Sequence, residues 1–456
     1  MRLSGWRWLA VSSLLCVSLS TAETRPQYGG NLRITTRIAP SSLDPADRTQ
    51  ADSVARRNLD SLIFDTLVTI DNRGRLQPAL ATSWKAEPSN QRWQFWLRRG
   101  VKFHDGSPLT PEAVAASLRV ANPGWNVLPA NDSVIIERDG PAPDLGVELA
   151  RAQNAIAKRS AGGSVMGTGP FHVTDWQPGK KLSVAAEEGY WAGRTFLDAI
   201  EIEMGKNSRD QLISLELGRA DVVEIGSEQS HRASTEGRRV VSSSPVELLT
   251  LVFTRERKSP GEGQLRDALA LSIDRASIRS VVLQGSGEPS GAILPSWISG
   301  YAFVFPTEQN LLRARQERNE IRQVPVWTLG YDANDTLGKV IAERVALNAR
   351  DAGLTVQTTP NANTDIRLMR LTLASLNPRV ALARVAATLG MAAPKFGNGS
   401  ADDLYQAESS LLQTQRFIPL FQLPVSYALN TSVQDWDQNQ DGSWHPDVAW
   451  LENSRP

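Results

Sequence analysis

A strand–helix–strand pattern between residues 324 and 359 narrows the possible folds more than any other part of the sequence. Val324–Leu329 and Leu354–Thr359 are predicted strands, and Thr336–Ala352 between them carries an apolar stripe at helical spacing. Gly353 supplies the left-handed residue that commonly follows the end of a helix. A strand, a crossover helix and a returning strand form a βαβ unit, which belongs in a parallel sheet. We therefore predict an α/β protein.

Local patterns predict further strands and helices along the chain. Polar and apolar residues alternate over Asn31–Ile38, as in a strand with one wetter face. Asp52 is expected to cap a helix, and Thr110-Pro111-Glu112 combines the hydroxyl, proline and carboxylate of a helix start. The other predicted elements are strands at Trp93–Phe103 and Asp365–Leu371 and helices at Gln264–Ser272, Asp274–Leu283 and Pro378–Ala393.

Length and charge restrict the class of protein. A chain of 456 residues is expected to form two or three domains, because a domain usually has about 100–200 residues. Lysine plus arginine and aspartate plus glutamate each number 49, so charge gives no reason to expect a nucleic-acid partner. No run of about 18 apolar residues follows Ala22, and we expect no membrane-spanning segment in the mature chain.

The first residues, Met1–Ala22, have the pattern of a secretory signal peptide. Two arginines precede an apolar run of about 12 residues, and small residues occupy the −3 and −1 positions of a cleavage site after Ala22. We predict a cleaved signal peptide and a periplasmic location, with an uncleaved membrane anchor as the alternative. The only cysteine, Cys16, would leave with this segment, so we expect neither a disulfide bond nor a lipid anchor.

Linear motifs of catalysis are missing from the sequence. It has no HExxH, GxSxG, Walker or paired CxxC pattern, and its four histidines are not spaced as metal ligands. We therefore expect a protein that is not an enzyme and has no cofactor. Asp437–Gly442, with Asn439 and Asp441, matches the first half of a calcium loop, but Val448 stands where a bidentate glutamate is needed. We expect an Asx-rich turn there, with calcium binding as the alternative.

Eight short motifs follow one another between residues 28 and 275. They are Tyr28–Leu32 (YGGNL), Ser42–Pro45 (SLDP), Phe64–Val68 (FDTLV), Gln77–Trp84 (QPALATSW), Arg98–Thr110 (RRGVKFHDGSPLT), Gly167–Phe171 (GTGPF), Gly189–Trp191 (GYW) and Leu265–Arg275, which contains LRDAL and SIDR. Together they resemble the family 5 extracellular solute-binding proteins, the peptide- and nickel-binding components of ABC importers. His104 and Asp105 lie inside one of these motifs and are interpreted as structural.

The resemblance implies an α/β fold of the bilobed periplasmic-binding-protein type (class II) that holds its ligand between two lobes. Because the chain crosses between the lobes and returns, we expect lobe I at 23–65, 167–246 and 425–456 and lobe II at 247–424. Residues 66–166 would form a third subdomain of reduced size. The implied partners are a small-molecule or peptide ligand and an ABC permease in the inner membrane, and we expect a monomer.

Two departures from the resemblance keep a second function open. The subdomain is short, and the segment after Asp365–Leu371 lacks the tryptophan and acidic residue found in many members; Asn377 stands where an acid is expected. An ammonium group buried in a closed cleft needs a charged partner, which a neutral side chain cannot provide. We therefore expect weak binding of free peptides and a preference for neutral or anionic ligands. The alternative function is a periplasmic sensor or chaperone-like binding module that works without a transporter.

Candidate ligand contacts come from loops at the carboxyl ends of strands, where open α/β sheets bind ligands, and from a loop with aromatic residues. The candidates are Ser41 and Ser42 after the first strand, Trp297 and Tyr301 in a Pro/Gly-rich loop, Tyr331 after the strand of the βαβ unit, and Arg367 on a strand. The alternatives are turn hydroxyls for the serines, ordinary packing for the aromatic residues and a surface ion pair for the arginine.

Overall fold

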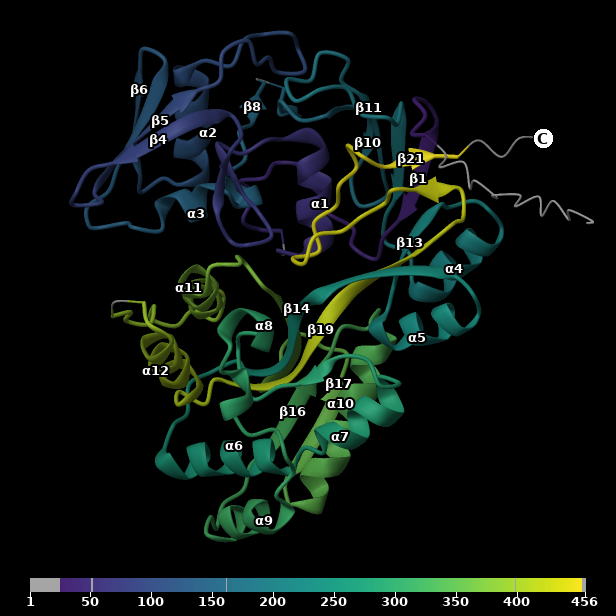
Figure 1. The fold of residues 1–456 in the computed structure, drawn as a ribbon. Helices are drawn as coiled ribbons and strands as arrows, with labels where there is room; N and C mark the ends of the chain where they lie inside the picture. Colours follow the sequence, from purple (N-terminus) through teal and green to yellow (C-terminus); the bar gives the residue numbers. More distant parts are fainter. Residues whose placement is uncertain (1–24, 51, 161, 398, 453–456) are drawn as a thin grey trace, which may run out of the picture.

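The computed structural model describes residues 25–50, 52–160, 162–397 and 399–452. The predicted signal peptide, Met1–Ala22, lies outside these residues. Two lobes stand one above the other in Figure 1, and a smaller subdomain extends from the upper lobe. None of the helices within the described residues is both long and apolar enough to cross a membrane.

A mixed eleven-stranded sheet runs through both lobes. Its strand order is β10-β11-β12-β1-β13-β19-β14-β18-β16-β17, and β15 pairs with β19. The strands are β1 (Asn31–Thr35), β10 (Phe171–Gln177), β11 (Lys181–Ala186), β12 (Ala199–Glu203), β13 (Val222–Ile225), β14 (Arg239–Phe253), β15 (Glu288–Pro289), β16 (Val326–Gly330), β17 (Thr355–Thr359), β18 (Ile366–Thr372) and β19 (Phe417–Leu429).

The N-terminal lobe is built on β10–β13 and β1, where β1 is parallel to both of its neighbours. Alternate residues of β1 point into the core, and Leu32 and Ile34 are fully buried. The helices of this lobe are α1 (Val54–Ile63), α4 (Ser208–Glu216) and α5 (Ser227–Thr235). The C-terminal segment returns to this lobe, and its Trp436 and Trp444 pack in the same core, next to β20 (Val433–Gln434) and β21 (Trp450–Leu451).

The C-terminal lobe contains the predicted βαβ unit. Strands β16 and β17 are parallel, with Val326 opposite Thr355, and α10 (Thr336–Asp351) connects them, which confirms the prediction. Gly353 has φ +78°, as expected for the residue that ends this helix. The other helices are α6 (Pro260–Ser272), α7 (Arg275–Ser277), α8 (Ser296–Ser299), α9 (Leu311–Asn319), α11 (Pro378–Thr388) and α12 (Ala401–Leu412), with short η2 (Ile278–Val282) and η3 (Ala302–Val304).

The subdomain has its own four-stranded sheet and its own core. The strand order is β4-β5-β7-β6, and buried Phe95 and Val134 belong to its core. Its elements are β2 (Val68–Ile70), β3 (Leu76–Pro78), β4 (Ala81–Ala86), β5 (Arg92–Leu97), α2 (Pro111–Ala121), β6 (Asn126–Ala130), β7 (Ser133–Glu137), α3 (Leu145–Leu149), η1 (Ala152–Asn154), β8 (Lys158–Arg159) and β9 (Val165–Met166). The predicted start of α2 is confirmed, because the Thr110 hydroxyl accepts a hydrogen bond from the Ala113 N–H (3.3 Å).

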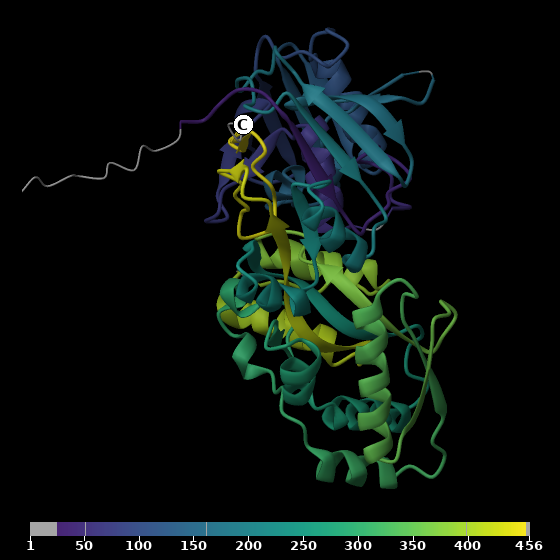
Figure 2. The same ribbon diagram turned by 90° about the vertical axis from the view of Figure 1, so that its right-hand side faces the viewer.

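Two long antiparallel strands, β14 and β19, join the lobes. Arg239 of β14 pairs with Leu429 in the N-terminal lobe, and Val252 pairs with Phe417 in the C-terminal lobe. The register shifts around Pro245, where the pairing passes from one lobe to the other. Figure 2 shows both strands passing through the narrow region between the lobes.

Some predicted elements have different ends in the structure. The strand expected at Trp93–Phe103 ends at Leu97, because a turn follows in which Gly100 has φ +81°. Ser53, not Asp52, caps α1: its hydroxyl accepts a hydrogen bond from the Arg56 N–H (3.2 Å).

Three further predicted elements are longer than the elements observed. The strand expected to reach Ile38 ends at Thr35. The helix expected at Asp274–Leu283 changes from α7 into the π-helical turn η2. The helix expected at Pro378–Ala393 ends at Thr388, two residues before Gly390 with φ +63°.

Candidate functional site

Charged side chains gather on the N-terminal lobe where β1 and β13 end. Arg37 follows β1, and its Nη2 lies 2.6 Å from Oε1 of Glu224 on β13. The Arg37 backbone N–H also donates to Glu224 Oε2 (3.0 Å). Burial would raise the pKa of Glu224, but the charge and hydrogen bonds of Arg37 outweigh it and lower that pKa. The pair is therefore ionised and holds its geometry at the carboxyl edge of the sheet.

The C-terminal lobe presents a second group of charges to this pair. Arg370 of β18 lies 3.1 Å from Asp335 and 3.8 Å from Glu247, measured between nitrogen and oxygen. Burial raises the pKa of Glu247, although Arg370 and Arg37 oppose this shift. Glu224 is the main cause of a raised pKa for Arg37, and Glu247 and Asp335 add to it, so charges of the two lobes act on each other. These five residues are the ion-pair cluster.

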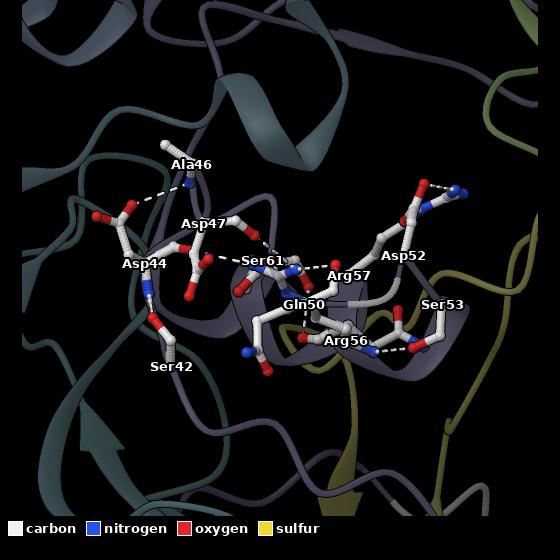
Figure 3. A network of polar contacts seen from close by, with 12 residues as sticks. Ser42, Asp44, Ala46, Asp47, Gln50, Asp52, Ser53, Arg56, Arg57 and Ser61 are labelled. Atoms are coloured by element: carbon white, nitrogen blue, oxygen red, sulfur yellow. Dashed lines mark hydrogen bonds and ion pairs between the residues drawn. The ribbon is translucent and has the colours of Figure 1, made fainter. Parts of the chain in front are cut away.

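A second meeting place of the lobes lies at the start of α1. Arg57 donates to both carboxylate oxygens of Asp52, at 2.7 Å each, and Figure 3 shows this fork. The third nitrogen, Nη1, donates to the Leu373 carbonyl of the other lobe (2.7 Å). Thr372 donates to the Asp52 carbonyl (3.4 Å), also across the lobes. Burial would raise the pKa of Asp52, but Arg57 and neighbouring arginines lower it.

Two more arginines complete this group. Arg151 follows α3, its side chain is 10% exposed, and its Nη2 lies 3.8 Å from Asp52 Oδ2. Arg384 on α11 comes from the other lobe and donates to Gln153 Oε1. Burial, followed by the charges of Arg384 and Arg57, lowers the pKa of Arg151 to about 9. Arg57, Arg151 and Arg384, with Asp52, are the arginine cluster.

The loop before α1 holds the arginine cluster in place. Arg56, next to Arg57, is buried and donates to the carbonyls of Asp44 (3.0 Å), Asp47 (3.2 Å) and Gln50 (3.2 Å). Figure 3 shows these contacts, which wrap the loop around the guanidinium. Because the loop leads directly into α1, this packing fixes the helix end from which Arg57 projects.

A small apolar cavity lies in the C-terminal lobe beside the arginine cluster. Its free space is about 10 Å³, the lower limit for one water molecule. It is lined by Val246, Leu248, Ile293, Leu294, Pro295, Leu371, Thr372, Leu373, Ala374, Ala381, Val385 and Gln422.

The aromatic candidates lie in three different surroundings. Trp297, on α8, packs against the core of the N-terminal lobe and donates from Nε1 to the Pro245 carbonyl (2.9 Å). Tyr301 is 9% exposed and stacks edge-on with Tyr405, within the C-terminal lobe. Tyr331 is half-buried against the core of that lobe. Trp297 is thus the aromatic candidate that touches both lobes.

The polar candidates are occupied locally or exposed. The Ser41 hydroxyl accepts from Gln50 Nε2 (2.9 Å), and the Ser42 hydroxyl accepts from the Asp44 N–H (3.1 Å), as in a turn. Arg367 is exposed on β18. These positions do not test whether the residues bind ligand, and their roles stay predictions.

Sequence reasoning missed the arginine cluster and most of the ion-pair cluster. Asn377, which stands where an acid was expected, caps α11: its Oδ1 accepts from the N–H groups of Arg379 (3.0 Å) and Val380 (3.3 Å).

The Asp437–Gly442 segment forms a turn in which Gly442 has φ +84° and Asp441 accepts from Ser443. This is the Asx-type geometry that was expected; calcium binding itself stays untested.

Comparisons with known proteins point to one family. A sequence model described as bacterial extracellular solute-binding proteins, family 5 middle, matches residues 75–409. The nickel-binding protein NikA of Staphylococcus aureus is 23% identical over 320 residues, which cover 64% of this chain and 63% of NikA. A probable D,D-dipeptide-binding periplasmic protein, DdpA of Escherichia coli, is 23% identical over 324 residues, covering 63% and 61%. The chain thus spans about three fifths of the length of these curated relatives.

A solved structure shows the same fold over nearly the whole chain. The binding protein AgaA of A. tumefaciens R10, in complex with agropinic acid, superimposes with a TM-score of 0.79 at 17% identity. The match covers 93% of this chain and 99% of AgaA. The predicted bilobed α/β fold of the periplasmic-binding-protein type is therefore confirmed.

Proposed function

The chain belongs to the family 5 bacterial extracellular solute-binding proteins, and on this premise we propose that it captures a solute between its lobes in the periplasm and delivers it to an ABC importer. One observation of the molecule carries the proposal. Two lobes with separate cores are joined by β14 and β19 and meet through charged side chains of both, as in the contact of Arg57 with the Leu373 carbonyl (2.7 Å). Family membership also agrees with the expectation of a binding protein without catalytic residues.

The lobe borders and ligand contacts belong to the same proposal. We propose 23–65, 167–246 and 425–456 for lobe I, 66–166 for the subdomain and 247–424 for lobe II. Among the candidate contacts, Trp297 has the strongest support, because its ring packs on one lobe while its helix belongs to the other. The packing of its ring would therefore change whenever the two lobes separate.

The test uses the ligand that the native protein carries. Mass spectrometry of protein purified from periplasmic extract identifies the ligand, and solution scattering then compares the ligand-free and saturated protein. Closure of the lobes should reduce the radius of gyration. An unchanged radius at saturation contradicts capture between lobes. If the purified protein closes on the ligand but the cells that produce it do not import that ligand, delivery is contradicted and the sensor or chaperone-like role is identified instead.

A further inference from the structure

The two strands that join the lobes lose their regular pairing at a pair of prolines. Pro245 of β14 lies opposite Pro424 of β19, and the register shifts on both sides of Pro245. Proline has no backbone N–H, so neither residue can donate a hydrogen bond to the ladder. Hinges between moving lobes are short segments of this kind, in which a few residues absorb the backbone change. We call residues 242–247 of β14 and 423–426 of β19 the hinge segment.

Side chains replace part of the missing ladder in the hinge segment. The Ser243 hydroxyl accepts from the Val425 N–H (3.0 Å), and buried Gln438 donates from Nε2 to the Val425 carbonyl (3.1 Å). Trp297 donates from Nε1 to the Pro245 carbonyl (2.9 Å). Ser243 lies on the hinge strand itself and Gln438 in the segment that returns to the N-terminal lobe, whereas Trp297 lies on α8, beside these strands (Figure 1). Of these three side chains, only Trp297 comes from the C-terminal lobe.

The loop before α8 attaches Trp297 firmly to the C-terminal lobe. Glu408 of α12 is fully buried, and its Oε1 accepts from the N–H groups of Leu294 (3.0 Å) and Ile293. Gln422 donates from Nε2 to the Ile293 carbonyl (2.9 Å). Side chains thus hold both the N–H and the carbonyl of Ile293. Because α8 begins shortly after Leu294, the indole of Trp297 has little freedom to follow the other lobe.

The ring of Trp297 packs across the hinge segment. It lies against the core of the N-terminal lobe, which includes Val246 and Val425 beside the two prolines. The indole therefore connects a helix of one lobe with the hinge segment and the core of the other. Rotation of the lobes about the hinge segment would break its hydrogen bond, because the donor and the acceptor would move with different bodies.

We propose that Trp297 is a latch on the hinge, whose indole N–H holds the Pro245 carbonyl while the lobes touch and so sets how often they separate. One neutral hydrogen bond is small against the stability of a fold, but it changes a balance between two arrangements about fivefold. The inference rests on the proposed capture function and adds how closure is regulated. In this role Trp297 is a positioning residue, and the latch does not require contact with the ligand.

The first experiment measures lobe separation in the ligand-free protein. Cys16, the only cysteine, lies in the predicted signal peptide, so spin labels can be placed on Asp139→Cys in the subdomain and Asp402→Cys on α12, both exposed positions. In electron paramagnetic resonance, Trp297→Phe should raise the ratio of long to short label distances about fivefold, as expected for one lost hydrogen bond. An unchanged ratio contradicts the latch.

Hydrogen exchange of residues 242–247 gives a second measure of the same opening. It should accelerate by the same factor in Trp297→Phe. If one arrangement dominates the label distances of the parent, this exchange decides, because it detects open states that are rarely populated. Exchange at the rate of the parent would then contradict the latch.

Matched variants separate the hydrogen bond from ordinary packing. Trp176 packs against the same core from within the N-terminal lobe, so Trp176→Phe loses the same atoms and should leave lobe separation unchanged. Trp297→His keeps an N–H in a five-membered ring and should separate the lobes less than Trp297→Phe. Circular dichroism verifies folding; if Trp297→Phe is not folded, Trp297→Met, which also lacks the donor, takes its place. Equal separation in the Trp297 and Trp176 variants contradicts the latch.

The two proposals can fail separately. If the co-purified ligand closes the parent but Trp297→Phe leaves the ligand-free lobes unchanged, the latch is wrong and capture stands. If Trp297→Phe separates the ligand-free lobes and the co-purified ligand never changes their separation, the latch stands and capture by closure is wrong.

Discussion

Asp65 shows how its surroundings change a single carboxyl group. Its oxygens accept hydrogen bonds from Thr168 Oγ1 (2.8 Å), Trp191 Nε1 (2.9 Å) and Tyr190 Oη (3.1 Å). These donors favour the ionised form, but burial outweighs them and raises the pKa to about 6. The group binds its proton more tightly in the folded chain than in the unfolded chain.

The raised pKa of Asp65 predicts a pH-dependent contribution to stability. The contribution is fully present below the unfolded value of about 3.8 and is lost as the pH rises through about 6. It should amount to about 2–3 kcal/mol, since one pKa unit corresponds to about 1.4 kcal/mol. Urea unfolding from pH 4 to 7 should therefore show a flatter pH profile for Asp65→Asn than for the parent. Exposed Asp139→Asn should keep the parent profile; parallel curves for the parent and Asp65→Asn contradict the assignment.

At the scale of single elements, the end of α10 depends on one backbone conformation. Gly353 has φ +78°, and a Cβ there would lie 3.2 Å from Arg318 Nε. A residue with a side chain is disfavoured in this left-handed region by about 1–2 kcal/mol. Gly353→Ala should lower the free energy of unfolding by about that amount. Gly140→Ala is the matched control, because its added Cβ meets no atom within 4 Å and its φ is not left-handed. Equal losses in a chemical denaturation series would contradict the explanation.

Elements were predictable where their signals are local. The strands around α10, its terminal glycine and the Thr110 cap depend on neighbours a few residues away. Element ends were less predictable, because Gly100 and Gly390 stop a strand and a helix whose apolar pattern continues. The fold of the whole chain was predictable for a different reason. The eight motifs resemble those of a known family, and the fold of that family was expected for this chain.

The arginine cluster was not predictable from local patterns. Arg384 meets Gln153 across 231 residues of sequence, and Arg57 meets the Leu373 carbonyl across 316. The hydrophobic pattern around each of these two arginines does not distinguish it from an ordinary surface arginine. Only the return of the chain through β14 and β19 brings these segments together, so the site belongs to the fold and not to any one motif.

At the scale of the whole molecule, contacts away from the arginine cluster also hold the lobes together. Asp144, before α3, lies 3.2 Å from Arg379 Nε on α11 and accepts from Asn377 Nδ2 (3.5 Å). Both groups of the ion pair are partly exposed, with 28% of each side chain accessible. Such a pair contributes about 0.2–1 kcal/mol, which is small for folding but comparable to a balance between open and closed lobes.

Loss of this contact should therefore shift the balance toward the open arrangement. Ligand-free Asp144→Ala is expected to have a larger radius of gyration in solution scattering than the parent. Because the binding-competent closed state is then less populated, ligand affinity should fall by up to about fivefold, the factor that corresponds to about 1 kcal/mol. Asp139→Ala, an exposed change in the same subdomain, should leave both quantities unchanged. If Asp144→Ala changes affinity without changing the radius, Asp144 contacts the ligand and does not act through closure.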